Sequence, residues 1–314
     1  MKRRFGYPFS NKRAHHKIHK KRQNNLLAHK KIHTTYLLVI VIMFFTGCTS
    51  SHMKIAVLNG DGWISEKSFY EKEVHYGTTR VDKCIKASVS ITGEVVRNID
   101  HWCFSGVTRL NTGNKYTEEE IKYGSAIVRI PFSKIVGGTS GMSLVKLDHD
   151  IGLVPFLYKL SSDDLLVFIH GFNTSFTNAA IRTAQIAHDT NFKGEAVFYS
   201  WPSAENPLTY AVDKKRAKEN FDKLANFLLN IASNTDKKIH IVGHSMGTYL
   251  LMNSLSVIDQ KIARNPSILA DRRKNNNGKL FDQVILAAPD IAKDDYLQEF
   301  SEYNLSELAK RITM

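Results

Sequence analysis

The serine with the strongest setting for nucleophilic chemistry is Ser245, in the pentapeptide Gly243-His244-Ser245-Met246-Gly247. An apolar run, KIHIVG, precedes it, and TYLLMNSLSVI follows with the spacing of a helix. Gly-x-Ser-x-Gly between a strand and a helix is typical of a nucleophile elbow, a sharp turn that lifts the hydroxyl above the carboxyl edge of a parallel sheet. We therefore predict that Ser245 is a nucleophile. The alternative is an ordinary glycine-flanked turn.

A nucleophile elbow also indicates which backbone amides would stabilise the negative charge that develops during the reaction. The start of the following helix aims its unpaired N–H groups at the serine, so we predict the Met246 amide as one oxyanion donor. The loop FIHGFNTSF (168–176) is placed to supply the second, the Phe172 amide. In the same loop His170 could act as a base, although we favour a role in ordering the loop through its ring nitrogens.

The base and the acid of a catalytic triad are harder to find. No histidine follows His244 in the chain, and without a base a serine hydroxyl is a weak nucleophile. His244 itself points along the elbow, so we do not expect it to act as the base. Asp290, in LAAPD, is our candidate acid, and its alternative role is to cap a helix that begins at Ile291. The more usual place for the acid is one strand later, outside this chain. No metal constellation or cofactor fingerprint is present.

Alternating strands and helices after Ser161 position these groups. We predict one amphipathic helix after the loop at 168–176 and one whose buried face runs from Ala217 to Ile231. The predicted strands are LLVFIHG (165–171), EAVFYSW (195–201), KIHIVG (238–243) and FDQVILAAPD (281–290). Strands buried on both faces and alternating with helices predict a mostly parallel α/β sheet with flanking helices, here over residues 161–314. Residues 49–160 are β-rich in KIAVLNG, ASVSITGEVV and SAIVRIPF, which suggests a sheet edge or a small N-terminal extension.

Five segments in order resemble a family of uncharacterised bacterial α/β-hydrolases, within an esterase- and lipase-like superfamily. The resemblance covers roughly residues 123 to 311 and rests on VFIHGFNTSFTNAA, AQIAHDTNFKG, VFYSWPS, IVGHSMGTYLL and FDQVILAAPD. It implies an α/β-hydrolase fold, Ser245 as the nucleophile, and a triad in the chain order serine, acid, histidine.

The end of the chain departs from that order. LAKRITM stops where a fifth core strand would begin, so we expect a sheet that is incomplete at its C-terminus, through truncation or through loss of catalysis. Two functions follow. One is a serine hydrolase acting on a small-molecule or lipid ester, and the other is a hydrolase-like binding module without catalysis.

The net charge of +13 is concentrated in the leader. Residues 1–33 hold eleven Lys and Arg and no acidic residue, which leaves +2 for the rest of the chain. A body so close to neutrality does not predict a nucleic-acid partner.

An apolar stretch of signal-peptide length follows the leader. Residues 34–48 end in Phe45-Thr46-Gly47-Cys48, which resembles a bacterial lipoprotein signal and predicts a lipid on Cys48 and a place in the bacterial cell envelope, anchored to the membrane. The alternative is a signal anchor with an incidental cysteine. Cys84 and Cys103 then form either a disulfide or two separate buried thiols.

Overall fold

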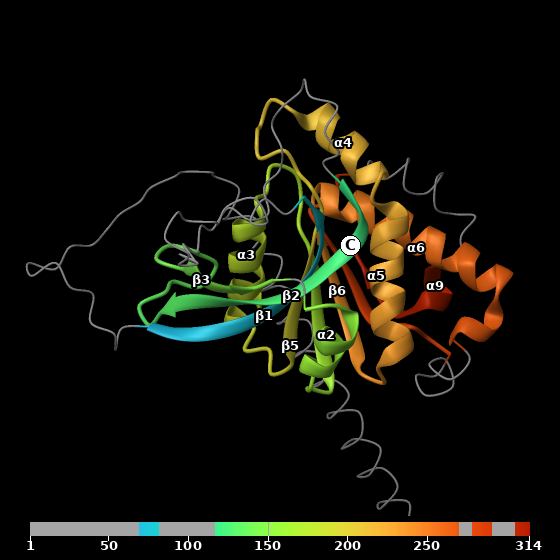
Figure 1. Ribbon diagram of the computed structural model, residues 1–314, viewed down its shortest axis with the longest axis horizontal. Coiled ribbons are helices and arrows are strands. Elements are labelled where there is room, and N and C mark those ends of the chain that lie inside the picture. Colours follow the sequence, from blue (N-terminus) through green and yellow to red (C-terminus); the bar gives the residue numbers. More distant parts are fainter. Residues whose placement is uncertain (1–68, 82–116, 150, 270–277, 291–304) are drawn as a thin grey trace, which may run out of the picture.

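The computed structural model describes residues 69–81, 117–149, 151–269, 278–290 and 305–314 (Figure 1). Its strands are β1 (Phe69–Arg80), β2 (Thr117–Pro131), β3 (Ser143–Asp148), β4 (Asp164–Ile169), β5 (Glu195–Ser200), β6 (Lys238–His244), β7 (Phe281–Ala287) and β8 (Ala309–Thr313). Its helices are α2 (Leu153–Lys159), α3 (Phe176–Asp189), α4 (Tyr210–Lys218), α5 (Phe221–Asn234), α6 (Met246–Arg264), the 3-10 turn η3 (Pro266–Leu269) and α9 (Leu305–Leu308).

Several predicted features lie outside these ranges. They are the leader 1–33, the signal 34–48 with Cys48, the Cys84 and Cys103 pair, the runs KIAVLNG and ASVSITGEVV, and the start of a helix at Ile291. Within the described ranges, no helix combines the length and apolarity needed to cross a membrane.

The strands form a single sheet of eight in the order β3-β2-β1-β5-β4-β6-β7-β8. From β1 to β8 all neighbours are parallel, whereas β2 pairs antiparallel with both β1 and β3. The predicted fold class, a mostly parallel sheet with flanking helices, is confirmed. The three strands that precede α2 extend the same sheet at one edge.

Helices cover both faces of the sheet because its central strands are apolar on both sides. Along β4, Leu165, Val167 and Ile169 face a core shared with α5 and α6. The alternate residues Leu166 and Phe168 face a second core beneath α3, as the two-residue period of a strand requires. Figure 1 shows α3 on one side of the strands and α5 and α6 on the other. The predicted α3 is confirmed, with its cap at Ser175, whose side chain accepts a hydrogen bond from Asn178 N.

Two details differ from the sequence-based expectation. The single helix predicted after β5 is divided into α4 and α5 at Asn220. The Asn220 side chain is fully buried, and it donates to Arg216 O while its oxygen accepts from Thr79 Oγ1 and Tyr199 Oη. Three partners from three elements hold this residue in place, and their contacts explain the break.

The second difference is at the end of the chain. Residues Ala309–Thr313, which were expected to stop short of a fifth core strand, form β8 and pair in parallel with β7. In β8 Ala309 is buried, whereas Lys310 and Arg311 are exposed. The strand therefore lacks the apolar run by which a buried strand is recognised in a sequence. Lys310 Nζ is tied back to Asp282 Oδ1 of β7 at 2.7 Å.

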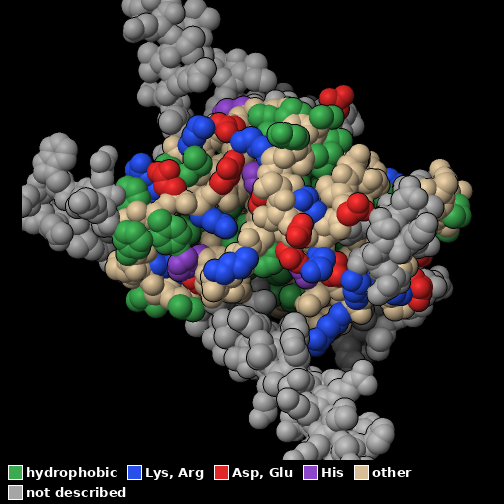
Figure 2. Space-filling view, turned by 90° about the horizontal axis from the view of Figure 1, so that it is seen from below, with side chains coloured by type: hydrophobic (Ala, Val, Ile, Leu, Met, Phe, Trp, Pro, Cys, Tyr) green, Lys and Arg blue, Asp and Glu red, His purple; other side chains and the backbone are tan. Residues whose placement is uncertain are grey.

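The strand order reverses at the carboxyl ends of β4 and β6. These strands are direct neighbours, with Ile169 opposite Gly243, and the chain leaves β4 toward β5 on one side and reaches β6 on the other. In open parallel sheets such a reversal of strand order is where ligands bind. On the face seen in Figure 2, Lys and Arg side chains are interspersed with Asp and Glu rather than gathered by sign.

Candidate active site

Ser245 is the single residue between β6 and α6, and its backbone is strained. Its φ of 52° and ψ of −126° lie in a region that residues with a Cβ rarely occupy. Hydrogen bonds hold it on both sides, since Ser245 N donates to Ala287 O at 3.0 Å and Thr248 N donates to Ser245 O at 2.8 Å. Its side chain is half-buried. This geometry is that of the sharp strand-to-helix turn expected for a nucleophile elbow.

The two flanking glycines allow that turn. A Cβ on Gly247 would stand 2.4 Å from His170 O and 2.5 Å from Ile169 O, both backbone atoms at the end of β4. A Cβ on Gly243 would meet Thr248 Cα and a Leu251 methyl at 3.1 Å. Both positions therefore require a residue without a Cβ, and the requirement is much stronger at Gly247.

The loop after β4 lies directly against the elbow. A Cβ on Gly171 would stand 2.8 Å from His244 O and 3.0 Å from Ser245 Cβ. Phe172 follows at once, half-buried, and its ring meets the Tyr210 ring edge-on with centroids 5.5 Å apart. The structure thus brings the Phe172 loop and the start of α6 at Met246 to the same serine. The roles of their two amides as oxyanion donors stay predictions.

Asp290 reaches the elbow through its backbone. Asp290 N lies 3.4 Å from Ser245 O as a long hydrogen bond. Its side chain accepts a hydrogen bond from Tyr210 Oη, with 2.6 Å between Oη and Oδ2. Burial, together with the neighbouring Asp290 carboxylate, raises the pKa of Tyr210 to about 12, so this phenol stays protonated and donates at neutral pH. The role of Asp290 as triad acid remains a prediction.

His170 is built into the loop rather than poised over the serine. Its Nδ1 lies 2.9 Å from Gly171 O, and because a carbonyl only accepts, Nδ1 carries the proton. Its ring stacks on Trp201 with centroids 5.1 Å apart, and Trp201 Nε1 donates to His170 O at 2.8 Å. Burial and the charge of Arg80 lower the pKa of His170 to about 3. These contacts favour the loop-ordering role.

Other described histidines have partners away from the elbow or a weakened basicity. Burial lowers the pKa of His244 to about 4, and the charge of Arg182 adds to the effect. His188 Nδ1 lies 2.8 Å from Asp189 Oδ1, and His240 Nε2 lies 3.3 Å from Asp164 Oδ1. In the described part of the chain no group of three or more His, Cys, Asp or Glu residues is arranged to hold a metal ion.

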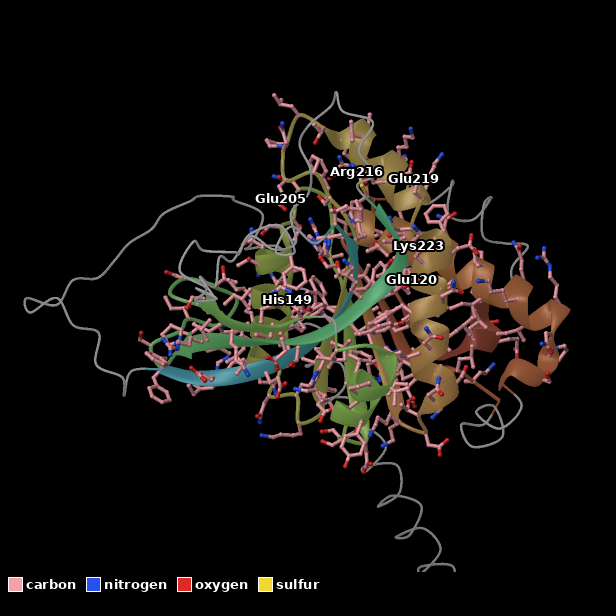
Figure 3. The ribbon with its side chains drawn as sticks, in the orientation of Figure 1. Glu120, His149, Glu205, Arg216, Glu219 and Lys223 are labelled. Atoms are coloured by element: carbon pink, nitrogen blue, oxygen red, sulfur yellow. The ribbon has the colours of Figure 1, made fainter. Side chains whose placement is uncertain are left out.

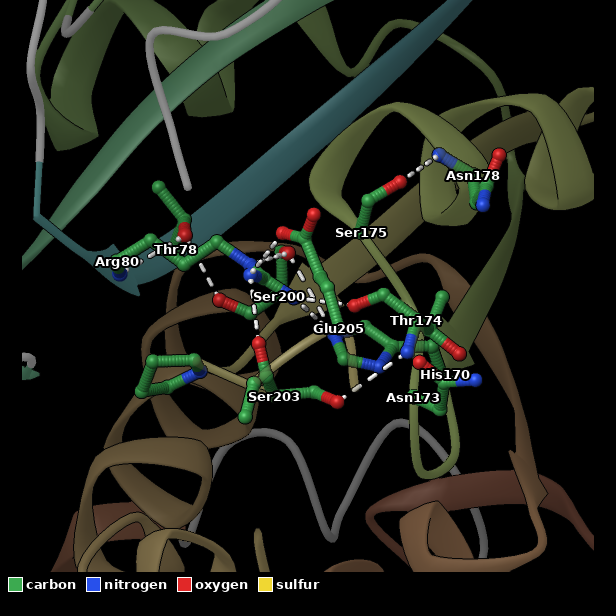
Figure 4. Close-up of polar contacts among 12 residues, drawn as sticks. Thr78, Arg80, His170, Asn173, Thr174, Ser175, Asn178, Ser200, Ser203 and Glu205 are labelled. Atoms are coloured by element: carbon green, nitrogen blue, oxygen red, sulfur yellow. Dashed lines mark hydrogen bonds and ion pairs between the residues drawn. The ribbon is translucent and has the colours of Figure 1, made fainter. Parts of the chain in front are cut away.

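Two buried charges near the loop were missed by sequence reasoning. Arg80, at the end of β1, contacts the loops that follow β4 and β5 (Figure 4). Asp213 of α4 accepts from Ser203 Oγ at 2.6 Å and from Ala204 N at 2.7 Å. In Figure 3, Glu205 of the loop after β5 and Arg216 of α4 lie at the same end of the molecule. No sequence motif marks either charge. The partners of the Arg80 side chain lie at least 90 residues away along the chain, and Ala204 and Ser203 lie 9 and 10 residues before Asp213 in an irregular loop.

Two comparisons with known proteins bear on this site. Residues 149–314 match the model of a family described as "Alpha/beta hydrolase of unknown function (DUF900)". The uncharacterized protein alr1448 of Nostoc sp. (strain PCC 7120) is 26% identical over a region that covers 44% of this chain and 45% of that relative. The match thus spans less than half the length of the curated relative.

Proposed function

This chain belongs to the family of alpha/beta hydrolases of unknown function (DUF900), and from that premise we propose that it is a serine hydrolase. It cleaves an ester or a related acyl bond through an acyl-enzyme on Ser245. The observation that carries the proposal is the strained backbone of Ser245, held by hydrogen bonds on both sides at the elbow. Such strain in a residue that could instead be glycine is typical of functional positions.

The reaction uses the serine oxygen in two stages. In the first, Ser245 Oγ bonds to the carbonyl carbon of the substrate, and the carbonyl electron pair moves onto its oxygen. When that pair returns, the bond to the leaving alkoxide breaks and the alkoxide takes up the proton lost by the serine. Water then attacks the acyl-enzyme in the same way and releases the acid and the free serine.

Charge on the carbonyl oxygen is stabilised by backbone amides in this proposal. Met246 is the first residue of α6, where N–H groups have no partner within the helix. The Phe172 amide belongs to the loop that packs against Ser245 through Gly171. Preorganised donors of this kind contribute about 10²- to 10³-fold each to the rate.

Asp290 is the acid of the triad in this proposal. Its Oδ2 accepts the Tyr210 hydrogen bond, and its Oδ1 is the oxygen that would orient a base. The described histidines with known partners do not supply that base, because His170, His188 and His240 are engaged elsewhere. The base is therefore the triad member that the proposal leaves unassigned.

The substrate class follows from the surroundings of the elbow. The Phe172 and Tyr210 rings meet beside it, and Tyr210 is 40% exposed. Apolar groups at the rim of a hydrolase site favour an apolar acyl or alcohol group. We propose a small-molecule or lipid ester, with activity rising along a nitrophenyl ester series as the acyl chain lengthens.

Labelling with a fluorophosphonate probe tests the nucleophile. In the full-length protein the serine oxygen displaces fluoride from phosphorus, and we expect one label on the peptide that contains Ser245. Ser245→Ala should abolish both labelling and ester hydrolysis. Ser254→Ala is the matched control, since Ser254 lies buried on the same helix with its hydroxyl bonded to Leu250 O.

Absence of labelling would distinguish the binding module from the serine hydrolase. A folded wild-type protein that takes no label and hydrolyses no ester would end the catalytic proposal in favour of the binding module. Labelling that persists in Ser245→Ala would show that another residue reacts.

We also propose that Cys48 carries a lipid that holds the protein at the membrane of a bacterial cell envelope. The support is the sequence at 45–48. Metabolic labelling with a palmitate analogue should mark the wild type and not Cys48→Ala. Release of the variant into the soluble fraction is expected, and membrane retention of an unlabelled variant would contradict the lipid.

A further inference from the structure

Arg80 is a fully buried charge whose donors are all engaged. A guanidinium has five N–H groups, and five acceptors surround this one (Figure 4). The contacts are Nε to Ser200 Oγ at 2.8 Å, Nη1 to Ser203 O and to Glu205 Oε1 at 3.3 Å each, Nη2 to Thr174 O at 2.7 Å, and Nη2 to His170 Nε2 at 3.4 Å. Because Nδ1 of His170 holds the ring proton, Nε2 is free to accept.

Two of these contacts bracket the Phe172 amide. His170 lies two residues before Phe172 and Thr174 two residues after it, and both are bound by Nη2 of the same guanidinium. The rest of the guanidinium holds the loop after β5 through Ser200 and Ser203. Arg80 therefore joins the carboxyl ends of β1, β4 and β5 at the loop that faces the nucleophile.

The buried side chain of Asp213 binds the backbone amides of the same loop. Asp213 Oδ2 accepts from Asn173 N at 3.4 Å and from Ser203 Oγ at 2.6 Å. Ser203 Oγ in turn accepts from Thr174 N at 3.2 Å. A cation thus binds a carbonyl of the loop, and an anion binds its amides directly and through a hydroxyl. These bonds fix the backbone directly after Phe172, while Arg80 holds the His170 ring before it.

Packing alone does not account for a charge in this position. The only acid in contact with Arg80 among the described residues is Glu205, whose side chain is 26% exposed. Replacing a buried ion pair by apolar side chains of similar volume is often neutral or stabilising, and one known use of a buried charged group is to fix a single geometry.

We propose that Arg80 is a positioning residue for the reaction at Ser245, and that it holds the Phe172 amide where the oxyanion develops. This inference rests on the proposed function. Arg80 acts through the loop and does not touch the reacting atoms. Its charge persists at neutral pH, because burial lowers its pKa only to about 10.

Substitution of Arg80 in the full-length protein tests the inference with nitrophenyl ester kinetics. We expect Arg80→Ala to lower kcat by about 10- to 100-fold, within the range for loss of one oxyanion donor, while KM changes by less than about threefold. Guanidinium ion added to this variant should restore part of kcat by occupying the vacated site. Arg80→Lys, whose single nitrogen cannot span both loops, should also lose kcat and serves if Arg80→Ala does not fold.

Two controls separate positioning from general damage. Arg129→Ala removes an arginine paired with Glu71 on the exposed surface of β2 and should leave kcat within about twofold. Phe156→Ala removes a buried ring of α2, which packs against His75 of β1 and Tyr123 of β2, and reports what lost stability alone does to kcat. Normal kcat in folded Arg80→Ala, or an equal loss in Phe156→Ala without guanidinium rescue, would overturn the inference.

Hydrogen exchange distinguishes failure of this inference from failure of the proposed function. If the wild type neither reacts with fluorophosphonate nor hydrolyses esters, the proposed function fails. Amide exchange over residues 170–175 then reports on the loop directly. Faster exchange there in Arg80→Ala or Arg80→Lys than in wild type supports the positioning role, and unchanged exchange contradicts it.

Discussion

The hydroxyl of Tyr210 donates to the carboxylate of Asp290 across the elbow, with 2.6 Å between Oη and Oδ2. Tyr210 begins α4 and Asp290 follows β7, eighty residues later. The contact joins the rim of the candidate site to the strand beside the nucleophile, because Asp290 N also bonds to Ser245 O.

Loss of this carboxylate should make the phenol more acidic. Burial and the Asp290 carboxylate hold the pKa of Tyr210 at about 12, and Asp290→Asn removes the negative charge that opposes phenolate formation. We expect the Tyr210 pKa to fall toward 10, as followed by tyrosinate absorbance with Tyr210→Phe identifying the signal. Asp222→Asn, at an exposed side chain, is the control. A Tyr210 pKa unmoved in Asp290→Asn would show that burial alone sets it.

The pKa of Tyr210 also sets the pH above which its contact with Asp290 stops contributing to stability. The Tyr210 pKa is higher in the folded protein than in the unfolded chain, so its contribution to stability is complete below pH 10 and is lost as the pH rises to about 12. Tyr210→Phe should flatten the stability profile in that window.

Gly247→Ala should unfold the elbow more severely than Gly243→Ala. The new methyl at position 247 would overlap the backbone carbonyls of Ile169, the last residue of β4, and of His170, which follows it. This overlap outweighs the gain of about 1 kcal/mol in helix propensity. We expect the free energy of unfolding to fall by about 3 kcal/mol or more for Gly247→Ala and by about 1 to 2 kcal/mol for Gly243→Ala. Urea denaturation measures both. Equal losses would contradict the ranking.

Acidification should destabilise the protein through His170. Its pKa is about 3 in the folded protein and near 6.5 when unfolded, so the stability present above pH 6.5 is lost progressively as the pH falls toward 3. At pH 5 the loss from this residue alone is about 2 kcal/mol. His170→Gln cannot titrate and should lose less stability between pH 7 and pH 5 than wild type.

Asp213→Asn should loosen the loop beside the nucleophile. The carboxylate accepts from Ala204 N and Ser203 Oγ, and an amide nitrogen placed there would face a donor instead. We expect a loss of about 1 to 3 kcal/mol in the free energy of unfolding, together with a lower rate of fluorophosphonate labelling at Ser245. Asp222→Asn, at an exposed side chain, should change stability by less than about 0.5 kcal/mol. Unchanged labelling in Asp213→Asn would separate Asp213 from the site.

The sequence by itself determined the parallel sheet, the elbow and the strand that feeds it. Apolar runs and helical periods are local signals, and the glycines around Ser245 report a local steric need, so β4 to β7, α3 and α6 could be predicted without coordinates. β1 and β8 gave weaker signals, because the buried half of β1 contains Thr78, Thr79 and Arg80 and β8 exposes Lys310 and Arg311.

Only the tertiary structure decided which side chains meet at the elbow. Arg80 lies 94 residues before Thr174 in the chain, and Tyr210 lies 80 residues before Asp290, so no spacing rule could pair them. Here the partners come together because parallel strands place their carboxyl ends at one edge of the sheet, where residues distant in sequence share a single site.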